Sequence, residues 1–170
     1  DVHIKDAIGR TWQCATIQLD MNLPERFDLK YVEEDGSEQR PVMIHRVIYG
    51  AVERFFGIII EHYAGAFPTW LSPVQVQFVP VSEKHVEGAR ALAQEFKDKG
   101  ARVEVDEADE TVGNKIRKAA KSKVPYVVVI GDKELSGEDW MIRVRREEEQ
   151  VKMGKRAFIE KVVEEIEIRR

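Results

Sequence analysis

The sequence predicts an α/β protein in two parts: an antiparallel sheet with a helix packed on it, then a small α/β domain with a mainly parallel, mixed sheet. Within residues 1–72, three stretches alternate apolar and polar side chains and lead into a long apolar run. Within residues 73–170, strand-like and helical stretches alternate around a fully apolar strand at residues 124–132. The stretch GAFPTWLSP, rich in proline, places the boundary near Ser72.

Composition limits the classes of function. Of the 170 residues, 43% are hydrophobic, which is enough for a core. The formal net charge of -4 excludes a general polybasic coat. A single cysteine, Cys14, excludes an internal disulfide and indicates a cytoplasmic protein. The longest apolar run, residues 55–60, is too short to span a membrane. Because the start at Asp1 lacks a methionine and runs into a strand, we expect an excised fragment whose N-terminal partner completes the first domain.

Polar side chains follow one face of the strand expected within residues 8–20. They are Thr16, Gln18 and Asp20. Gln13 is out of phase with this stripe and joins it only if a bulge intervenes near Ala15. A turn at Asn22–Arg26 and a second alternating strand at Phe27–Val32 are expected to follow. The stripe predicts either half of a binding site or a strand face that is exposed to solvent.

The third strand, residues 41–46, leads into a helix that is apolar on nearly every side and is therefore expected to be buried. Its apolar side chains are Val47, Ile48, Ala51, Val52, Phe55, Phe56, Ile58, Ile59 and Ile60. Arg54 stands among them, and a buried guanidinium needs an anion, either a phosphate or a structural carboxylate. His45, on the face opposite Val42 and Ile44, is either a metal ligand or a hydrogen-bonded core histidine.

The second part alternates strands and helices. Strands are expected at residues 74–82, 101–106, 124–132 and 140–145, and helices at residues 83–99, 111–123 and 155–170. No G-x-G-x-x-G or P-loop pattern follows the apolar strand, and no grouping of serine, cysteine and histidine indicates a covalent nucleophile. His3, His62 and His85 have no partners at metal-ligand spacing, which favours surface or structural roles for them.

Basic residues gather in the second part. Between Thr111 and Tyr126 there are five and no acid, and three arginines follow on the last strand: Lys115, Arg117, Lys118, Lys121, Lys123, Arg143, Arg145 and Arg146. One interpretation is a contact with a phosphate backbone, with Arg143 and Glu134 reading base edges. The other is a solvated helix face, partly neutralised by the acids that precede it.

Eight motifs occur in order along nearly the whole chain: GRTWQCATIQLD, LPERFDLKY, RPVMIHR, GAVERF, PTWLSPVQV, KIR at residues 115–117, VPY and VIGDKE. Together they resemble the C-terminal portion of threonyl-tRNA synthetase, a class II aminoacyl-tRNA synthetase. The resemblance implies the end of an antiparallel catalytic sheet with the motif 3 helix at residues 1–72, and an anticodon-binding domain at residues 73–170. It also implies a ligase that adenylates threonine with ATP and Mg²⁺ and then transfers it to threonine tRNA.

The resemblance implies roles for five residues of the first part. Arg54 matches the motif 3 arginine and would hold the phosphate region of ATP during catalysis. Gln13 and Thr16 match positions of the ATP site, and Gln18 matches one beside the threonine pocket. His45 matches one of three ligands to a catalytic Zn²⁺, which would bind the amino and hydroxyl groups of threonine and so reject valine. The other two ligands lie upstream in the family and are absent from this sequence.

The resemblance also implies an anticodon site in the second part. Glu134 and Arg143 match residues that contact the second and third anticodon bases, and Lys115 and Arg117 lie on the helix beside them. Asp109 stands where the family usually has an asparagine that reads the anticodon. A carboxylate cannot donate a hydrogen bond as an amide can, so this position departs from the family pattern.

Two further departures are Ala15, where many members have glycine, and Ala51, where many have serine. We expect the isolated fragment to be inactive, because the other zinc ligands and the motif 2 arginine are missing. The full-length enzyme is expected to be a cytoplasmic homodimer that uses ATP, Mg²⁺ and Zn²⁺ and has no membrane partner. Two other functions stay open: a non-catalytic paralogue or accessory module that binds tRNA, and a generic nucleotide-binding α/β protein.

Overall fold

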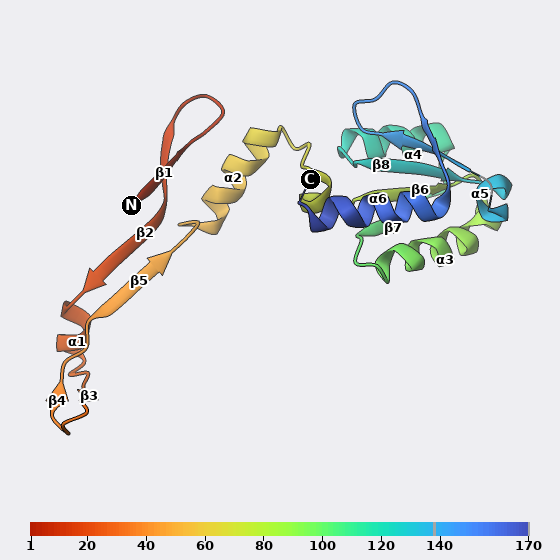
Figure 1. Cartoon of the computed structure of the whole chain (residues 1–170). Coiled ribbons are helices and arrows are strands. Elements are labelled where there is room, and N and C mark those ends of the chain that lie inside the picture. The colour runs from red at the N-terminus through yellow and green to blue at the C-terminus, as the bar shows by residue number, and fades with distance from the viewer. Residues whose placement is uncertain (138, 170) are drawn as a thin grey trace. The chain divides into compact units, whose positions relative to one another are not determined.

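The computed structural model describes residues 1–137 and 139–169, and it divides the chain into two compact units, Asp1–Tyr63 and Ala64–Arg170. The first unit carries an antiparallel sheet and the second a mixed, mainly parallel one (Figure 1). The predicted fold class is therefore confirmed. The domain limits 1–72 and 73–170 stay a prediction.

The first unit is built on a three-stranded antiparallel sheet of order β1-β2-β5. Its strands are β1 (Val2–Lys5), β2 (Thr11–Asp20) and β5 (Met43–Val47). Between β2 and β5 the chain forms α1 (Asn22–Arg26) and a small hairpin of β3 (Tyr31–Val32) and β4 (Glu38–Gln39). Helix α2 (Val52–Tyr63) follows β5 (Figure 1).

The segment after β2 differs from the sequence expectation. Residues 22–26, expected as a turn, form the short helix α1. Its start is stabilised by Asp20, whose Oδ1 atom accepts the N–H groups of Asn22 and Leu23 at 2.9 and 3.0 Å. The strand expected at Phe27–Val32 shrinks to its last two residues. The backbone N–H groups of Phe27, Asp28 and Leu29 donate to carbonyls of α1 instead of to a partner strand.

Helix α2, expected to be buried, is largely exposed. Only Ile58 is buried, whereas Phe56 is 59% exposed and Ile60 is 52% exposed. The periodicity correctly indicated an apolar helix, but the described part of this unit has no second layer to cover it. The sheet face that carries Ile17 and Leu19 is likewise open, since each of these side chains is more than 60% exposed.

The second unit is a five-stranded sheet of order β10-β9-β8-β6-β7, in which β6 is parallel to β7 and β8, and the other pairs are antiparallel. The strands are β6 (Val76–Pro80), β7 (Val103–Val105), β8 (Tyr126–Ile130), β9 (Trp140–Val144) and β10 (Val151–Met153). The helices are α3 (Val86–Lys97), α4 (Val112–Lys121), α5 (Asp132–Ser136) and α6 (Lys155–Glu167). Residue 170, the end of the last expected helix, lies outside the described residues.

Both faces of this sheet are covered, which explains the continuous apolar run of β8. On one face, α3 and α6 pack against the aromatic cluster Phe78, Phe96, Trp140 and Phe158, all at most 1% exposed. The Phe78 ring lies 5.4 Å from that of Phe96 and 5.8 Å from that of Trp140, centroid to centroid. On the other face, α4 packs against a smaller cluster (Figure 1).

The proline-rich segment before β6 is fastened to the second unit. The carbonyl of Thr69 accepts from Gln75 Nε2 at 2.9 Å, and the carbonyls of Trp70 and Ser72 accept from the guanidinium of Arg102. These bonds satisfy backbone acceptors that a loop would otherwise leave to water.

Candidate functional site

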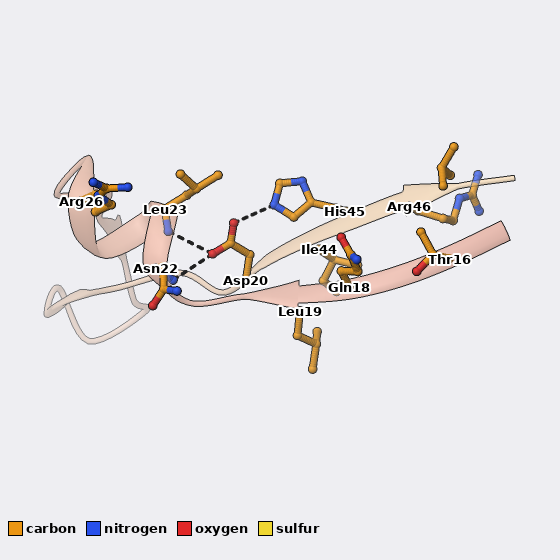
Figure 2. A pocket seen from close by; sticks show the side chains of 11 residues that line it. Thr16, Gln18, Leu19, Asp20, Asn22, Leu23, Arg26, Ile44, His45 and Arg46 are labelled. Carbon is orange, nitrogen blue, oxygen red and sulfur yellow. Dashed lines mark hydrogen bonds and ion pairs between the residues drawn. The ribbon is translucent and has the colours of Figure 1, made fainter. Parts of the chain in front are cut away.

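A polar hollow of about 1130 Å³ lies on one face of β2 and β5 in the first unit (Figure 2). Thr16 and Gln18 line it from β2, and His45 lines it from β5. These side chains share a face because Gln18 pairs directly with His45 in the antiparallel register. Three of the residues predicted from the sequence are thus brought together.

Asp20 completes this group and holds His45. Its Oδ2 atom lies 2.8 Å from Nε2 of His45, while its Oδ1 atom accepts the first N–H groups of α1 (Figure 2). The N–H of Leu23, followed by His45, holds the pKa of the Asp20 carboxyl below its usual value. With Nε2 engaged, Nδ1 is the ring nitrogen of His45 that remains for another partner. In the sequence, Asp20 was recognised only as a member of the polar stripe, and the stripe alone did not identify His45 as its hydrogen-bond partner.

A register irregularity, which the sequence made the condition for Gln13 to join the polar stripe, is present in β2 near Ala15. His3 of β1 pairs with Gln13 and Val2 pairs with Ala15, so Cys14 has no counterpart on β1. Gln13 is exposed and, unlike Thr16 and Gln18, does not line the polar hollow.

Arg54 also lies outside this hollow, near the start of α2. It is exposed instead of buried, and its guanidinium carbon lies over the ring of Trp12, 5.7 Å from the centroid. No carboxylate among the described residues pairs with Arg54, so the interpretation as a structural ion pair is not met, and the phosphate interpretation stays a prediction. The start of α2 is fixed against β2 by Gly50, whose φ is 67° and where a Cβ would meet the Cys14 carbonyl oxygen at 2.9 Å.

Asp6 closes the β1–β2 hairpin and should give the first unit an acid-dependent stability. Its fully buried carboxylate accepts from Trp12 Nε1 at 2.8 Å and from the backbone N–H of Arg10 at 2.8 Å. Burial opposes ionisation, yet these hydrogen bonds bring the pKa of Asp6 down to about 2. Because this folded pKa lies below the unfolded value of about 3.9, the carboxylate stabilises the unit fully above pH ~4, and that stability is lost as pH falls towards 2.

We therefore expect Asp6→Asn to flatten the pH dependence of unfolding of the first unit between about pH 4 and 2. Amide hydrogen exchange of β1 and β2 would measure it. Glu34→Gln, which changes an exposed carboxyl in the β3–β4 loop, is the matched control. Identical acid profiles for Asp6→Asn and the unmodified chain would contradict the assignment.

In the second unit, Glu134 is anchored through both its backbone and its side chain. Its Oε2 atom accepts the N–H of Gly131 at 3.0 Å, and its carbonyl accepts from Trp140 Nε1 at 3.1 Å. Both contacts fix the turn that follows β8. The second carboxylate oxygen, Oε1, is the one that a ligand donor could reach.

The same turn is tied to the start of α3 by His85. This histidine is 3% exposed; one ring nitrogen lies 2.9 Å from Ser82 Oγ, and the other lies 3.2 Å from Asp132 Oδ1. Lys84 adds a second contact to Asp132, and Lys84 and His85 together hold the pKa of that carboxyl below its usual value. These contacts agree with the structural role expected for His85. Sequence spacing did not identify Ser82 and Asp132 as its partners.

Arg143 lines a hollow of about 360 Å³ between β9 and α4. Apolar residues of α4 and β8 form its floor, and the basic side chains around it are Lys123, Arg143, Arg145 and Arg146. With the Gln150 amide oriented to satisfy both groups, its oxygen accepts from Arg143 Nη2 at 2.8 Å. Arg145 is bound to the carbonyls of Lys123 and Phe67, and burial lowers its pKa. Arg145 is therefore a structural residue here, whereas Arg143 and Arg146 are exposed.

The remaining predicted anticodon residues do not form one cluster of free cations. Lys115 is 6% exposed, and its ammonium donates to the carbonyl of Asp106 at 3.0 Å, which is a structural contact. Arg117 and Asp109 are exposed. Lys118 pairs with Glu110, so part of the basic run is neutralised locally, as the solvated-face interpretation expected.

Among residues 1–137 and 139–169, no three histidine, cysteine, aspartate or glutamate side chains gather in a way that could hold a metal ion. In the same residues, no helix is long and apolar enough to cross a membrane.

Comparison with known proteins gives consistent matches to both units. The family model of the class II tRNA synthetase core domain (G, H, P, S and T) matches residues 1–63, and that of the anticodon binding domain matches residues 75–165.

Two of the similar proteins are threonine–tRNA ligases of bacteria. That of Caldanaerobacter subterraneus is 51% identical over 98% of this chain and 26% of its own length. That of Carboxydothermus hydrogenoformans is 50% identical over 100% of this chain and 27% of its own length. This chain thus spans about a quarter of the length of these relatives.

A solved structure is also similar: the RNA binding domain of threonyl-tRNA synthetase from Cryptosporidium parvum Iowa II. Its TM-score is 0.80 at 37% identity, over 95% of this chain and 41% of that one. The family matches, the bacterial relatives and this structure agree on both units. The chain therefore belongs to the class II aminoacyl-tRNA synthetases with an anticodon binding domain, and within them to the threonyl-tRNA synthetase family.

Proposed function

We propose that this chain acts as part of a threonine–tRNA ligase, supplying one wall of the active site and the module that binds the tRNA anticodon. The observation that carries the proposal is the polar hollow of the first unit, where Thr16, Gln18 and His45 lie on one sheet face. Hydroxyl, amide and imidazole groups on a shared face suit a small polar substrate such as threonine.

His45 fits one position of a zinc site. Its Nε2 atom is engaged by the Asp20 carboxylate, which is the usual arrangement behind a metal-bound histidine, and its Nδ1 atom would face the ion. The ion, when bound by further ligands from the full-length protein, would hold the amino and hydroxyl groups of threonine. Valine offers no hydroxyl, so the site would discriminate against it.

The nucleotide side of the site would use Arg54, which is exposed and has no carboxylate partner in the described part of the chain. Gln13 and Thr16 are proposed to lie near ATP. We further propose that the full-length enzyme is a cytoplasmic homodimer that uses Mg²⁺ with ATP.

The anticodon contacts are proposed for Glu134 and Arg143. A guanidinium can donate two parallel hydrogen bonds to a base edge, and a carboxylate can accept from a base amino group. The anchoring of Glu134 by Gly131 and Trp140 holds its carboxylate in one place before RNA arrives. Arg117 on α4 would contact phosphates, whereas buried Lys115 would support the helix.

Replacing Arg143 with alanine should weaken binding of threonine tRNA by about tenfold, because a base-edge contact is worth about 1–3 kcal/mol, and it should relax the preference at one anticodon position. Fluorescence anisotropy of the chain with labelled tRNA transcripts, altered at the second or third anticodon base, would measure both effects. Arg156→Ala is the matched control, since its side chain is 92% exposed on α6. Equal affinity of the unmodified chain for every transcript would refute anticodon reading.

A non-catalytic tRNA-binding module is the alternative, and the closed core of the second unit favours it, because that unit carries its own buried cluster. The genomic reading frame separates the two. Motifs 1 and 2 encoded upstream would support the ligase, and a start codon just before Asp1 would support the module. Calorimetric binding of free ATP to the second unit would instead favour a generic nucleotide-binding protein.

A further inference from the structure

An aromatic ring, in place of a carboxylate, holds Arg54. Its guanidinium carbon lies over the Trp12 ring at 5.7 Å from the centroid, and that of Arg10 lies over the same ring at 5.5 Å. A ring attracts a cation through its negative π face and uses none of the guanidinium N–H donors. Those donors therefore stay available to an incoming anion.

The Trp12 ring is itself fixed. Its Nε1 atom donates to Oδ2 of Asp6 at 2.8 Å, and the Asp6 side chain is fully buried. The Oδ1 atom of Asp6 accepts the backbone N–H groups of Ile8 and Arg10 at 3.1 and 2.8 Å. The hairpin turn thus sets the position of the carboxylate, and the carboxylate sets the indole ring.

A second contact fixes the helix that carries Arg54. Nη2 of Arg10 lies 3.1 Å from Oε2 of Glu61, which follows Arg54 by seven residues. Seven residues are about two helical turns, so Arg54 and Glu61 lie on the same face of α2. That face therefore meets the β1–β2 hairpin at two points, and the direction of the Arg54 side chain is set between them.

We propose that Trp12 is a positioning residue for Arg54, oriented by Asp6, and that it presents the guanidinium in advance to the phosphate groups of a nucleoside triphosphate. The inference rests on the proposed function, in which Arg54 meets ATP. An arginine that is already ordered loses less rotamer freedom on binding. Since such a cation–π contact is worth about 0.5–1 kcal/mol when exposed, losing it should raise the KM for ATP about two- to fivefold.

The first test uses the chain itself and reads the contact directly. In NMR spectra of the arginine-labelled chain, the side-chain signals of Arg54 should be shifted by the ring current of Trp12. Trp12→Leu should abolish this shift, and Trp12→Phe should keep most of it. Asp6→Asn, which retains the ring but frees the indole N–H, should reduce the shift and serves as the second variant if Trp12→Leu does not fold. An Arg54 signal unchanged in both Trp12→Leu and Asp6→Asn overturns the proposal.

The second test uses the full-length threonyl enzyme that contains this segment. Trp12→Leu should raise the KM for ATP while the KM for threonine stays unchanged, and Trp12→Phe should restore it. Phe27→Leu, at a 68% exposed aromatic of the same unit, is the control. If Arg54→Ala impairs ATP use and Trp12→Leu does not, this inference fails alone. If Arg54→Ala leaves ATP use intact, the proposed function of Arg54 has failed with it.

Discussion

Replacing Arg54 with alanine in the full-length threonyl enzyme is expected to slow threonyl-adenylate formation by about 10²–10³-fold, the loss typical of a preorganised electrostatic donor. The reason lies in its surroundings: the side chain is exposed, has no carboxylate partner in the described residues, and is held over the ring of Trp12. No structural ion pair within the described residues therefore neutralises the positive charge of Arg54. ATP–pyrophosphate exchange would measure the loss.

Two variants sharpen this experiment. Arg54→Lys keeps the charge but loses the planar fork, so its rate should fall between those of Arg54→Ala and the unmodified enzyme. Arg40→Ala removes an arginine of the same unit that pairs with Asp28 outside the polar hollow, and it should leave exchange unchanged. Equal rates for Arg54→Ala and Arg40→Ala would contradict a role of Arg54 in ATP chemistry.

Replacing Phe78 with alanine is expected to destabilise the second unit by about 3–5 kcal/mol, because it removes a fully buried ring and leaves a cavity. Phe78 lies at the centre of the aromatic cluster, in edge contact with both Phe96 and Trp140. A loss of this size is comparable to the whole stability of a small domain, which is about 5–15 kcal/mol. Urea unfolding followed by tryptophan fluorescence would measure the change.

Phe56→Ala is the contrasting variant, since Phe56 is 59% exposed on α2. In this chain its removal should change the free energy of unfolding of the first unit by less than about 1 kcal/mol, because little apolar area leaves or enters water. A loss as large as that of Phe78→Ala would show that α2 is packed more tightly than its exposure indicates.

Local patterns predicted most of the second unit. The continuous apolar run of β8 and the periodicity of α3 were sufficient, because each element there meets the partner that its pattern requires. β10 was not predicted, since three residues are too few for alternation to be recognised. In the first unit, the burial expected for α2 failed because periodicity reports which face is apolar and not what covers it.

Alternation placed Thr16 and Gln18 on one face of β2, but it could not show that the antiparallel register brings His45 of β5 to the same face. The functional roles of these three residues stay predictions. Asp6 and Trp12 were not recognised from the sequence. Their roles depend on the β1–β2 hairpin turn and on contact with Arg54 of α2, which is distant in sequence. Lys115 was counted with the basic surface, since charge runs do not reveal which lysine turns inward.

The position of α6 has a consequence for the order in which the second unit is completed during synthesis. Phe158 and Val162, both 0% exposed, fill the same cluster as Phe78 of β6, although about eighty residues of chain separate them. The ribosome therefore makes the first core strand of this unit long before the helix that covers it. Until α6 emerges, the apolar side chains of β6 and α3 face water or a chaperone, so the second unit gains its stability late in translation.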